Sequence, residues 1–153
     1  MTDVYHELID ALSETPGRLN QLLKDWTAAG PRSNEEWGPA EVVAHLLDVE
    51  RLYRGHMQEI LRRREGAVLH QFDEQRTARE HDYAASDLAL SLGEFAAERG
   101  ETMSLLINLA LKDWDRAGIL DPEGQLSIED LAERLVDHDA EHLAQIEAGI
   151  TRG

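Results

Sequence analysis

Apolar side chains recur every three or four residues in four separate stretches of the chain. In the first stretch they are Val4, Leu8, Ile9, Leu12, Leu19, Leu22, Leu23 and Trp26. This spacing places them on one face of an α-helix. We therefore predict a helix over residues 3–26. Because Pro16 lacks a backbone N–H, we expect the helix to be broken or kinked there, with Thr15 as the N-cap of the second part.

A second amphipathic helix is predicted from Pro39 to the arginines at positions 62–64. Proline suits the first helical turn, and cations at the other end complement the helix dipole. Its apolar stripe consists of Val42, His45, Leu46, Val49, Leu52, Tyr53, His56, Ile60 and Leu61. One helical face of this segment should therefore be buried, and a histidine lies within it.

A third helix is predicted from a Ser86 cap to about Trp114, with apolar positions at three- and four-residue steps. Gly93 and Gly100 lie inside it, and each costs about 1 kcal/mol relative to alanine. We expect these two glycines to allow the close approach of a neighbouring helix.

The fourth helix is predicted to begin at a capping box formed by Ser127 and Asp130 and to end near Gly149. Its stripe contains Leu131, Leu135, His138, His142, Gln145 and Ile146. Connectors fall at residues 28–36, 66–85 and 115–125, and no segment shows strand-like alternation. The second connector is too long for a tight turn, so it should cross the bundle. We predict an all-α four-helix bundle in one domain, residues 1–153.

The charge balance limits the partners of this protein. It has 15 lysines and arginines against 31 aspartates and glutamates, a net charge of −16. Such a field repels phosphate backbones and anionic lipid, and no apolar run approaches the roughly 20 residues of a membrane span. We therefore expect a small-molecule substrate, with neither nucleic acid nor membrane as a partner. The absence of cysteine and of a signal-peptide pattern leads us to expect a cytoplasmic protein.

Three histidines on the predicted buried faces are the candidates for a functional site. His138 and His142 are one helical turn apart, which places their rings about 40° apart around the helix axis. His45 lies on the buried stripe of the second helix. Burying an unpaired imidazole costs about 1–3 kcal/mol, and one shared metal ion would satisfy a nitrogen on each ring. We predict a metal site of His45, His138 and His142. Hydrogen-bonded core histidines without a metal are the alternative.

Two carboxylates are candidates to orient these rings. Asp48 lies three residues after His45, and Glu141 lies three residues after His138. For Glu141, a solvated position on the helix surface is the stronger alternative. The chain contains no Gly-x-Ser-x-Gly, phosphate-binding loop or dinucleotide fingerprint. We therefore expect the nucleophile to be water or a thiol held at the metal, rather than a side chain.

Two stretches resemble the DinB-like superfamily. One is Glu41-Val42-Val43-Ala44-His45-Leu46-Leu47-Asp48-Val49-Glu50, preceded by Trp37. The other runs from Gly124 to Leu131 and on through His138-Asp139-Ala140-Glu141-His142 to Ile146. The chain departs from the family at Gly38, where relatives commonly carry serine or threonine, and at Asp121-Pro122, where they often carry histidine.

The resemblance implies a fold and a class of activity. It implies an up-down-down-up four-helix bundle, a divalent ion (often zinc or nickel) on the three histidines, and a Glu50–Arg99 pair. Family members are often homodimers. The superfamily also includes bacillithiol transferases and the metal-binding domain of mycothiol-dependent maleylpyruvate isomerase. A low-molecular-weight thiol is therefore an expected cosubstrate.

Three protein ligands would leave coordination positions open, as in catalytic rather than structural zinc sites. We expect a metal-dependent enzyme, either a thiol S-transferase or a hydrolase, acting on a small electrophilic molecule. The main alternative is a non-catalytic metal-binding bundle with a structural or stress-response role. A DNA-binding role in damage response is disfavoured by the net charge of −16.

Overall fold

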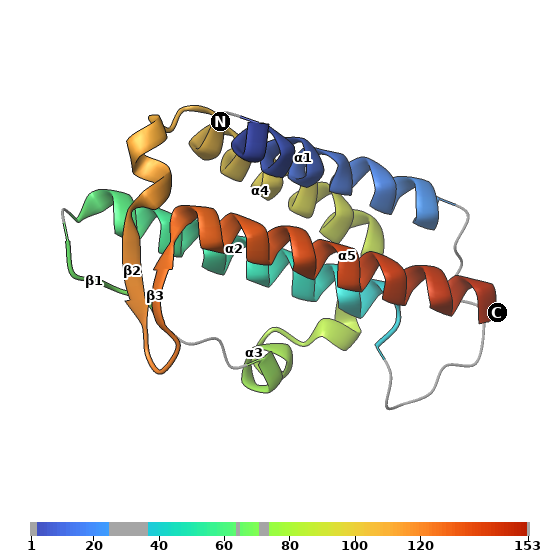
Figure 1. The fold of residues 1–153 in the computed structure, drawn as a ribbon. Helices are drawn as coiled ribbons and strands as arrows, with labels where there is room; N and C mark the ends of the chain where they lie inside the picture. The colour runs from blue at the N-terminus through green and yellow to red at the C-terminus, as the bar shows by residue number, and fades with distance from the viewer. Residues whose placement is uncertain (1–2, 25–36, 64, 71–73, 153) are drawn as a thin grey trace.

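Four long helices form the body of the protein in the computed structural model, which describes residues 3–24, 37–63, 65–70 and 74–152. They are α1 (Asp3–Leu23), α2 (Pro39–Arg62), α4 (Leu88–Ile107) and α5 (Ile128–Arg152). α1 and α5 run in one direction, and α2 and α4 run in the other (Figure 1). The predicted four-helix bundle with an up-down-down-up course is confirmed. The predicted connector at residues 28–36 lies entirely outside the described residues.

The long second connection follows from the directions of the helices. Because α2 and α4 run in the same direction, the chain must return along the bundle before α4 begins (Figure 1). It does so through β1 (Ala67–Val68), α3 (Glu74–Glu80) and the 3-10 turn η1 (Tyr83–Ala85). Both α1 and α2 pack against α4 and against α5. No helix in the described ranges combines the length and the apolar character needed to cross a bilayer.

Two of the helix ends differ from the sequence prediction. The N-cap of α4 is Asp87, whose side chain accepts a hydrogen bond from the Leu90 N–H (3.0 Å), rather than Ser86. α4 ends at Ile107, and Trp114 lies in a separate 3-10 turn, η2 (Leu111–Asp115).

The predicted capping box at the start of α5 is confirmed. Asp130 N–H donates to Ser127 Oγ (3.0 Å), and Ser127 N–H donates to Asp130 Oδ2 (2.9 Å). This reciprocal pair satisfies two backbone donors at the helix start.

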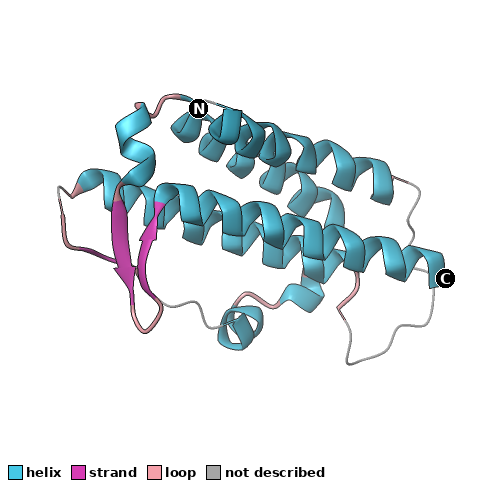
Figure 2. Ribbon diagram, in the orientation of Figure 1, coloured by secondary structure: helices cyan, strands magenta, loops and turns pink. Residues whose placement is uncertain are grey.

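A small sheet at one end of the bundle was not predicted. β1 pairs in parallel with β2 (Ala117–Leu120), which pairs antiparallel with β3 (Gly124–Ser127), as the magenta arrows of Figure 2 show for β2 and β3. Strands of two to four residues are too short for a polar–apolar alternation to be visible in the sequence. The pairing of β1 with β2 joins segments that are distant in sequence.

α1 is continuous through Pro16, so of the two outcomes expected there, the break, with Thr15 as the N-cap of a second helix, is wrong. Proline cannot donate the backbone hydrogen bond that would normally reach the carbonyl four residues earlier, here Leu12. The Arg99 guanidinium supplies that bond instead, with Nη1 2.7 Å from the Leu12 oxygen. The helix therefore loses one internal bond at Pro16 and gains one to α4.

A buried polar layer divides the core into two clusters. The first core cluster includes Leu12, Leu106, Trp114, Ile128 and Leu135, and the second includes Leu19, Leu46, Phe95, Leu143 and Ile146. The layer lies between these two clusters, and each long helix contributes one polar residue to it. These residues are Thr15, Glu50, Arg99 and Asp139, which are at most 4% exposed. The Glu50–Arg99 pair implied by the family resemblance is present.

The two glycines inside α4 give a stability prediction. A Cβ atom at Gly93 or Gly100 would meet no heavy atom within 4 Å, so the expected close helix approach is absent there. Gly93→Ala and Gly100→Ala should each raise the free energy of unfolding by about 0.5–1 kcal/mol, because alanine loses less backbone entropy in a helix. Urea denaturation measures this change.

Gly118→Ala in β2 is the matched control. Its Cβ would lie 3.0 Å from Leu69 Cγ and 3.2 Å from the Ala67 carbonyl oxygen. This substitution should lower the free energy of unfolding. A destabilising effect of Gly93→Ala would contradict the prediction.

Candidate metal centre

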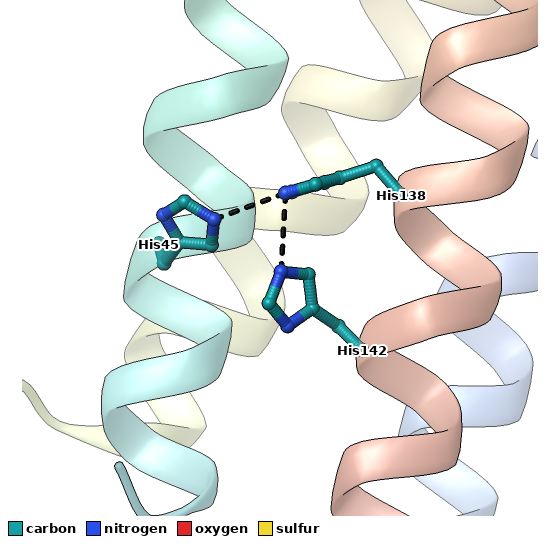
Figure 3. Close-up of side chains that lie close together, drawn as sticks. All are labelled: His45, His138 and His142. Carbon is teal, nitrogen blue, oxygen red and sulfur yellow. Dashed lines mark hydrogen bonds between the residues drawn. The ribbon is translucent and has the colours of Figure 1, made fainter. Parts of the chain in front are cut away.

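Three histidine side chains meet between α2 and α5. His45 Nε2 lies 3.0 Å from His138 Nε2, which lies 3.1 Å from His142 Nε2 (Figure 3). The three ligand atoms lie within 4.8 Å of one another. His45 and His142 are buried, and His138 is partly buried. The structure thus brings His45 to the pair of histidines one turn apart on α5.

The spacing of the ring nitrogens suits a single metal ion. Imidazole nitrogens bind zinc at about 2.0–2.1 Å, so ligand nitrogens lie about 2.9 Å apart at right angles and about 3.4 Å apart in a tetrahedron. The two Nε2 separations of 3.0 and 3.1 Å fall within this range. Three neutral imidazoles are also a donor set that divalent transition metals accept.

The environment keeps two of these rings neutral. Burial lowers the pKa of His45 to about 3, with a further contribution from His138 and His142. Burial likewise lowers the pKa of His138 to about 4, helped by His142 and by the positive charge of Arg99. Neutral imidazole retains the lone pair that a metal needs, so these residues are ready to bind metal at neutral pH.

Gln145 sets the tautomer of His142. His142 Nδ1 donates to Gln145 Oε1 (2.8 Å), which leaves the lone pair on Nε2, the nitrogen that faces the other two rings. Sequence reasoning did not assign Gln145 a role in the site. Its position three residues after His142 on the same helix face was the signal that could have identified it.

Aromatic rings pack against His45. The Trp37 ring lies 5.1 Å from the His45 ring, and the Tyr83 ring of η1 lies 6.3 Å from it. Trp37 and Tyr83 also contact each other, with centroids 5.5 Å apart. Tyr83 was not a predicted site residue, because no spacing rule connects a turn before α4 with a ligand on α2.

Asp48 and Glu141 are the two carboxylates that the sequence offered as candidates to orient the histidine rings. Asp48 Oδ2 accepts a hydrogen bond from the Tyr83 hydroxyl (2.6 Å) and one from His81 Nδ1 (2.5 Å). Asp48 is thus bonded to Tyr83, whose ring lies 6.3 Å from the His45 ring. Glu141 is exposed, as expected for a solvated carboxylate on the helix surface.

A groove of about 360 Å³ lies beside Asp48, between α2 and the start of α4. Asp48, His81, Tyr83 and Glu94 are among the residues that line it. None of the three histidines lines this groove, so it is separate from the candidate metal centre.

Comparison with known proteins identifies the family. The model of the DinB superfamily matches residues 7–146, and the chain belongs to this superfamily. A search of curated proteins found no match.

A solved structure has the same fold. It is YfiT from Bacillus subtilis, described as a probable metal-dependent hydrolase with an unusual four-helix bundle topology. The match has a TM-score of 0.84 and 22% sequence identity, and covers 97% of this chain and 86% of YfiT.

The lowered histidine pKa values predict an acid-sensitive fold. In the unfolded chain His45 and His138 titrate near pH 6.5, whereas in the folded protein they do so at about 3 and about 4. Below pH 6.5 the unfolded state binds more protons, so stability is complete above that pH and falls as the pH drops towards 4. The loss should approach about 1.4 kcal/mol per pH unit for each histidine.

Urea denaturation of metal-free protein between about pH 7 and pH 5 tests this prediction. The His45→Gln/His138→Gln double variant should show a shallower dependence on pH. His6→Gln, which changes an exposed histidine, should keep the wild-type dependence. Equal pH dependence in the wild type and the double variant would show that these two histidines are not the cause.

Proposed function

We propose that this protein is a divalent-metal-dependent enzyme that activates water or a low-molecular-weight thiol at His45, His138 and His142. The nucleophile would attack a small electrophilic molecule, in hydrolysis or in thiol S-transfer. Zinc and nickel are the metals we expect. The net charge of −16 supports a small-molecule substrate over a nucleic acid. A cytoplasmic location and a homodimer are part of the same proposal.

The number of converging ligands supports catalysis over a purely structural ion. Within the described part of the chain, the cluster that could hold a metal consists of three histidines, with no fourth side-chain ligand. Structural zinc sites usually fill all four positions with protein ligands, whereas catalytic sites commonly use three. This three-residue donor set is the observation that carries the proposal. The description of YfiT as a probable hydrolase agrees with it.

Each part of the site has a role in this chemistry. A divalent ion held there would lower the pKa of a bound water or thiol and so supply a nucleophile near neutral pH. The protein contributes three neutral imidazoles, two of them kept neutral largely by burial. Gln145 holds His142 with its Nε2 lone pair facing the centre. Trp37 and Tyr83 restrict the His45 ring from the side.

Metal content is the first test. Untagged wild-type protein should carry about one divalent ion per chain, and His142→Ala should lose most of it because two imidazoles bind far more weakly than three. Plasma mass spectrometry measures the metal content. His6→Ala is the matched control, since His6 is an exposed histidine on α1. Equal metal content in the wild type and His142→Ala, or none in either, would contradict the proposed site.

Activity is the second test. Metal-loaded protein should accelerate the conjugation of low-molecular-weight thiols with monochlorobimane, or the hydrolysis of activated esters without thiol. His142→Ala should reduce this rate by about 100-fold or more, and His6→Ala should leave it unchanged. If the metal raised only the melting temperature, with neither reaction accelerated, the non-catalytic metal-binding bundle would be favoured instead.

A further inference from the structure

One buried guanidinium joins the two helices that carry the metal centre. Arg99 Nε and Nη2 donate to the Glu50 carboxylate on α2 (2.9 and 2.8 Å). Arg99 Nη1 and Nη2 donate to the Asp139 carboxylate on α5 (2.8 and 3.0 Å). α2 carries His45, and α5 carries His138 and His142. The bridge therefore runs between the same two helices as the three ligands.

The anchor points lie close to the ligands along each helix. Asp139 directly follows His138, and Glu50 lies five residues after His45, about 7.5 Å along the helix axis. Paired bonds from a planar guanidinium to a carboxylate are directional. Sliding or rotating α5 against α2 would break them in a place where both partners are almost fully buried. The bridge thus restrains the relative position of the two helices.

α1 also forms hydrogen bonds with this bridge. Thr15 Oγ1 donates to Asp139 Oδ2 (2.7 Å), and Arg99 Nη1 donates to the Leu12 carbonyl that Pro16 cannot reach. With the bond to Leu12, all five N–H donors of Arg99 are used. The guanidinium has no spare donor that would let it move to another partner.

His138 depends on this restraint more than His142 does. Metal-binding histidines usually donate their second ring nitrogen to a partner that orients the ring. His142 has Gln145 in this role, whereas His138 Nδ1 is buried with no hydrogen-bond partner among the residues the structure describes. The position of the His138 ring is therefore set by its backbone and by packing, and the next residue on that backbone is Asp139.

We propose that Arg99 and Asp139 are positioning residues for the metal centre, holding α2 and α5 in the register that places His138 Nε2 beside His45 Nε2. This inference rests on the proposed metal binding of the three histidines. It assigns the polar layer a role in ligand geometry in addition to its role in the fold.

Metal affinity tests the inference. Asp139→Asn should weaken the zinc affinity of the apo-protein by about tenfold or more and shift the absorption spectrum of the cobalt-substituted protein. Thr15→Val removes one hydrogen bond to Asp139 and should produce a smaller change in the same direction. Ile128→Ala is the control, because Ile128 is fully buried in the first core cluster and begins α5 about 15 Å from His138. It should lower stability but leave affinity and spectrum unchanged.

A second measurement needs no metal. In crystals of the metal-free Asp139→Asn and Thr15→Val variants, the His45–His138 Nε2 separation should depart from 3.0 Å, by about 0.5 Å or more in Asp139→Asn. Ile128→Ala should keep it. If Asp139→Asn does not fold, Thr15→Val decides the outcome in both measurements.

The outcomes separate the two proposals. Folded variants with wild-type affinity, spectrum and Nε2 separation would overturn the positioning role and leave the proposed function intact. A wild-type protein that binds no metal would contradict the proposed function, and the crystal structures would then decide the positioning role alone.

Discussion

The buried contacts of Arg99 connect all four long helices. Its guanidinium bonds to Leu12 of α1, Glu50 of α2 and Asp139 of α5, and it lies 5.0 Å from the Phe95 ring on its own helix. Removing these charges from water is expensive, and the cost is offset only when every donor and acceptor is matched. Because Arg99 has all five donors engaged, the two core clusters can pack on either side of a polar layer.

The polar layer and the candidate metal centre are neighbours with opposite electrostatic character. The layer contains two carboxylates around one guanidinium, whereas burial keeps His45 and His138 of the centre uncharged. A neutral imidazole keeps the lone pair that a metal cation needs. The positive charge of Arg99, which helps to lower the pKa of His138, is balanced within the layer by Glu50 and Asp139. The fold can therefore contain a buried, fully paired arginine and, next to it, uncharged histidines that are able to bind a metal.

The topology of the bundle shapes the surroundings of the centre. Since α2 and α4 point the same way, the chain between them must return along the bundle (Figure 1). This return places Tyr83 against His45. Asp48, one turn after His45, then bonds to Tyr83 and His81 of the returning segment. The packing of an aromatic ring against the candidate metal centre is thus a consequence of the helix order.

Local sequence determined the four amphipathic helices, the capping box at Ser127 and the inward face of the three histidines. These features depend on spacing within one helix, and the family resemblance added the Glu50–Arg99 pair. Only the tertiary structure decided that α1 continues through Pro16, because the compensating hydrogen bond comes from Arg99, far along the chain. The tertiary structure also decided the pairing of β1 with β2, the packing of Tyr83 against His45 and the bond between Asp139 and Arg99. Each of these joins segments that are distant in sequence.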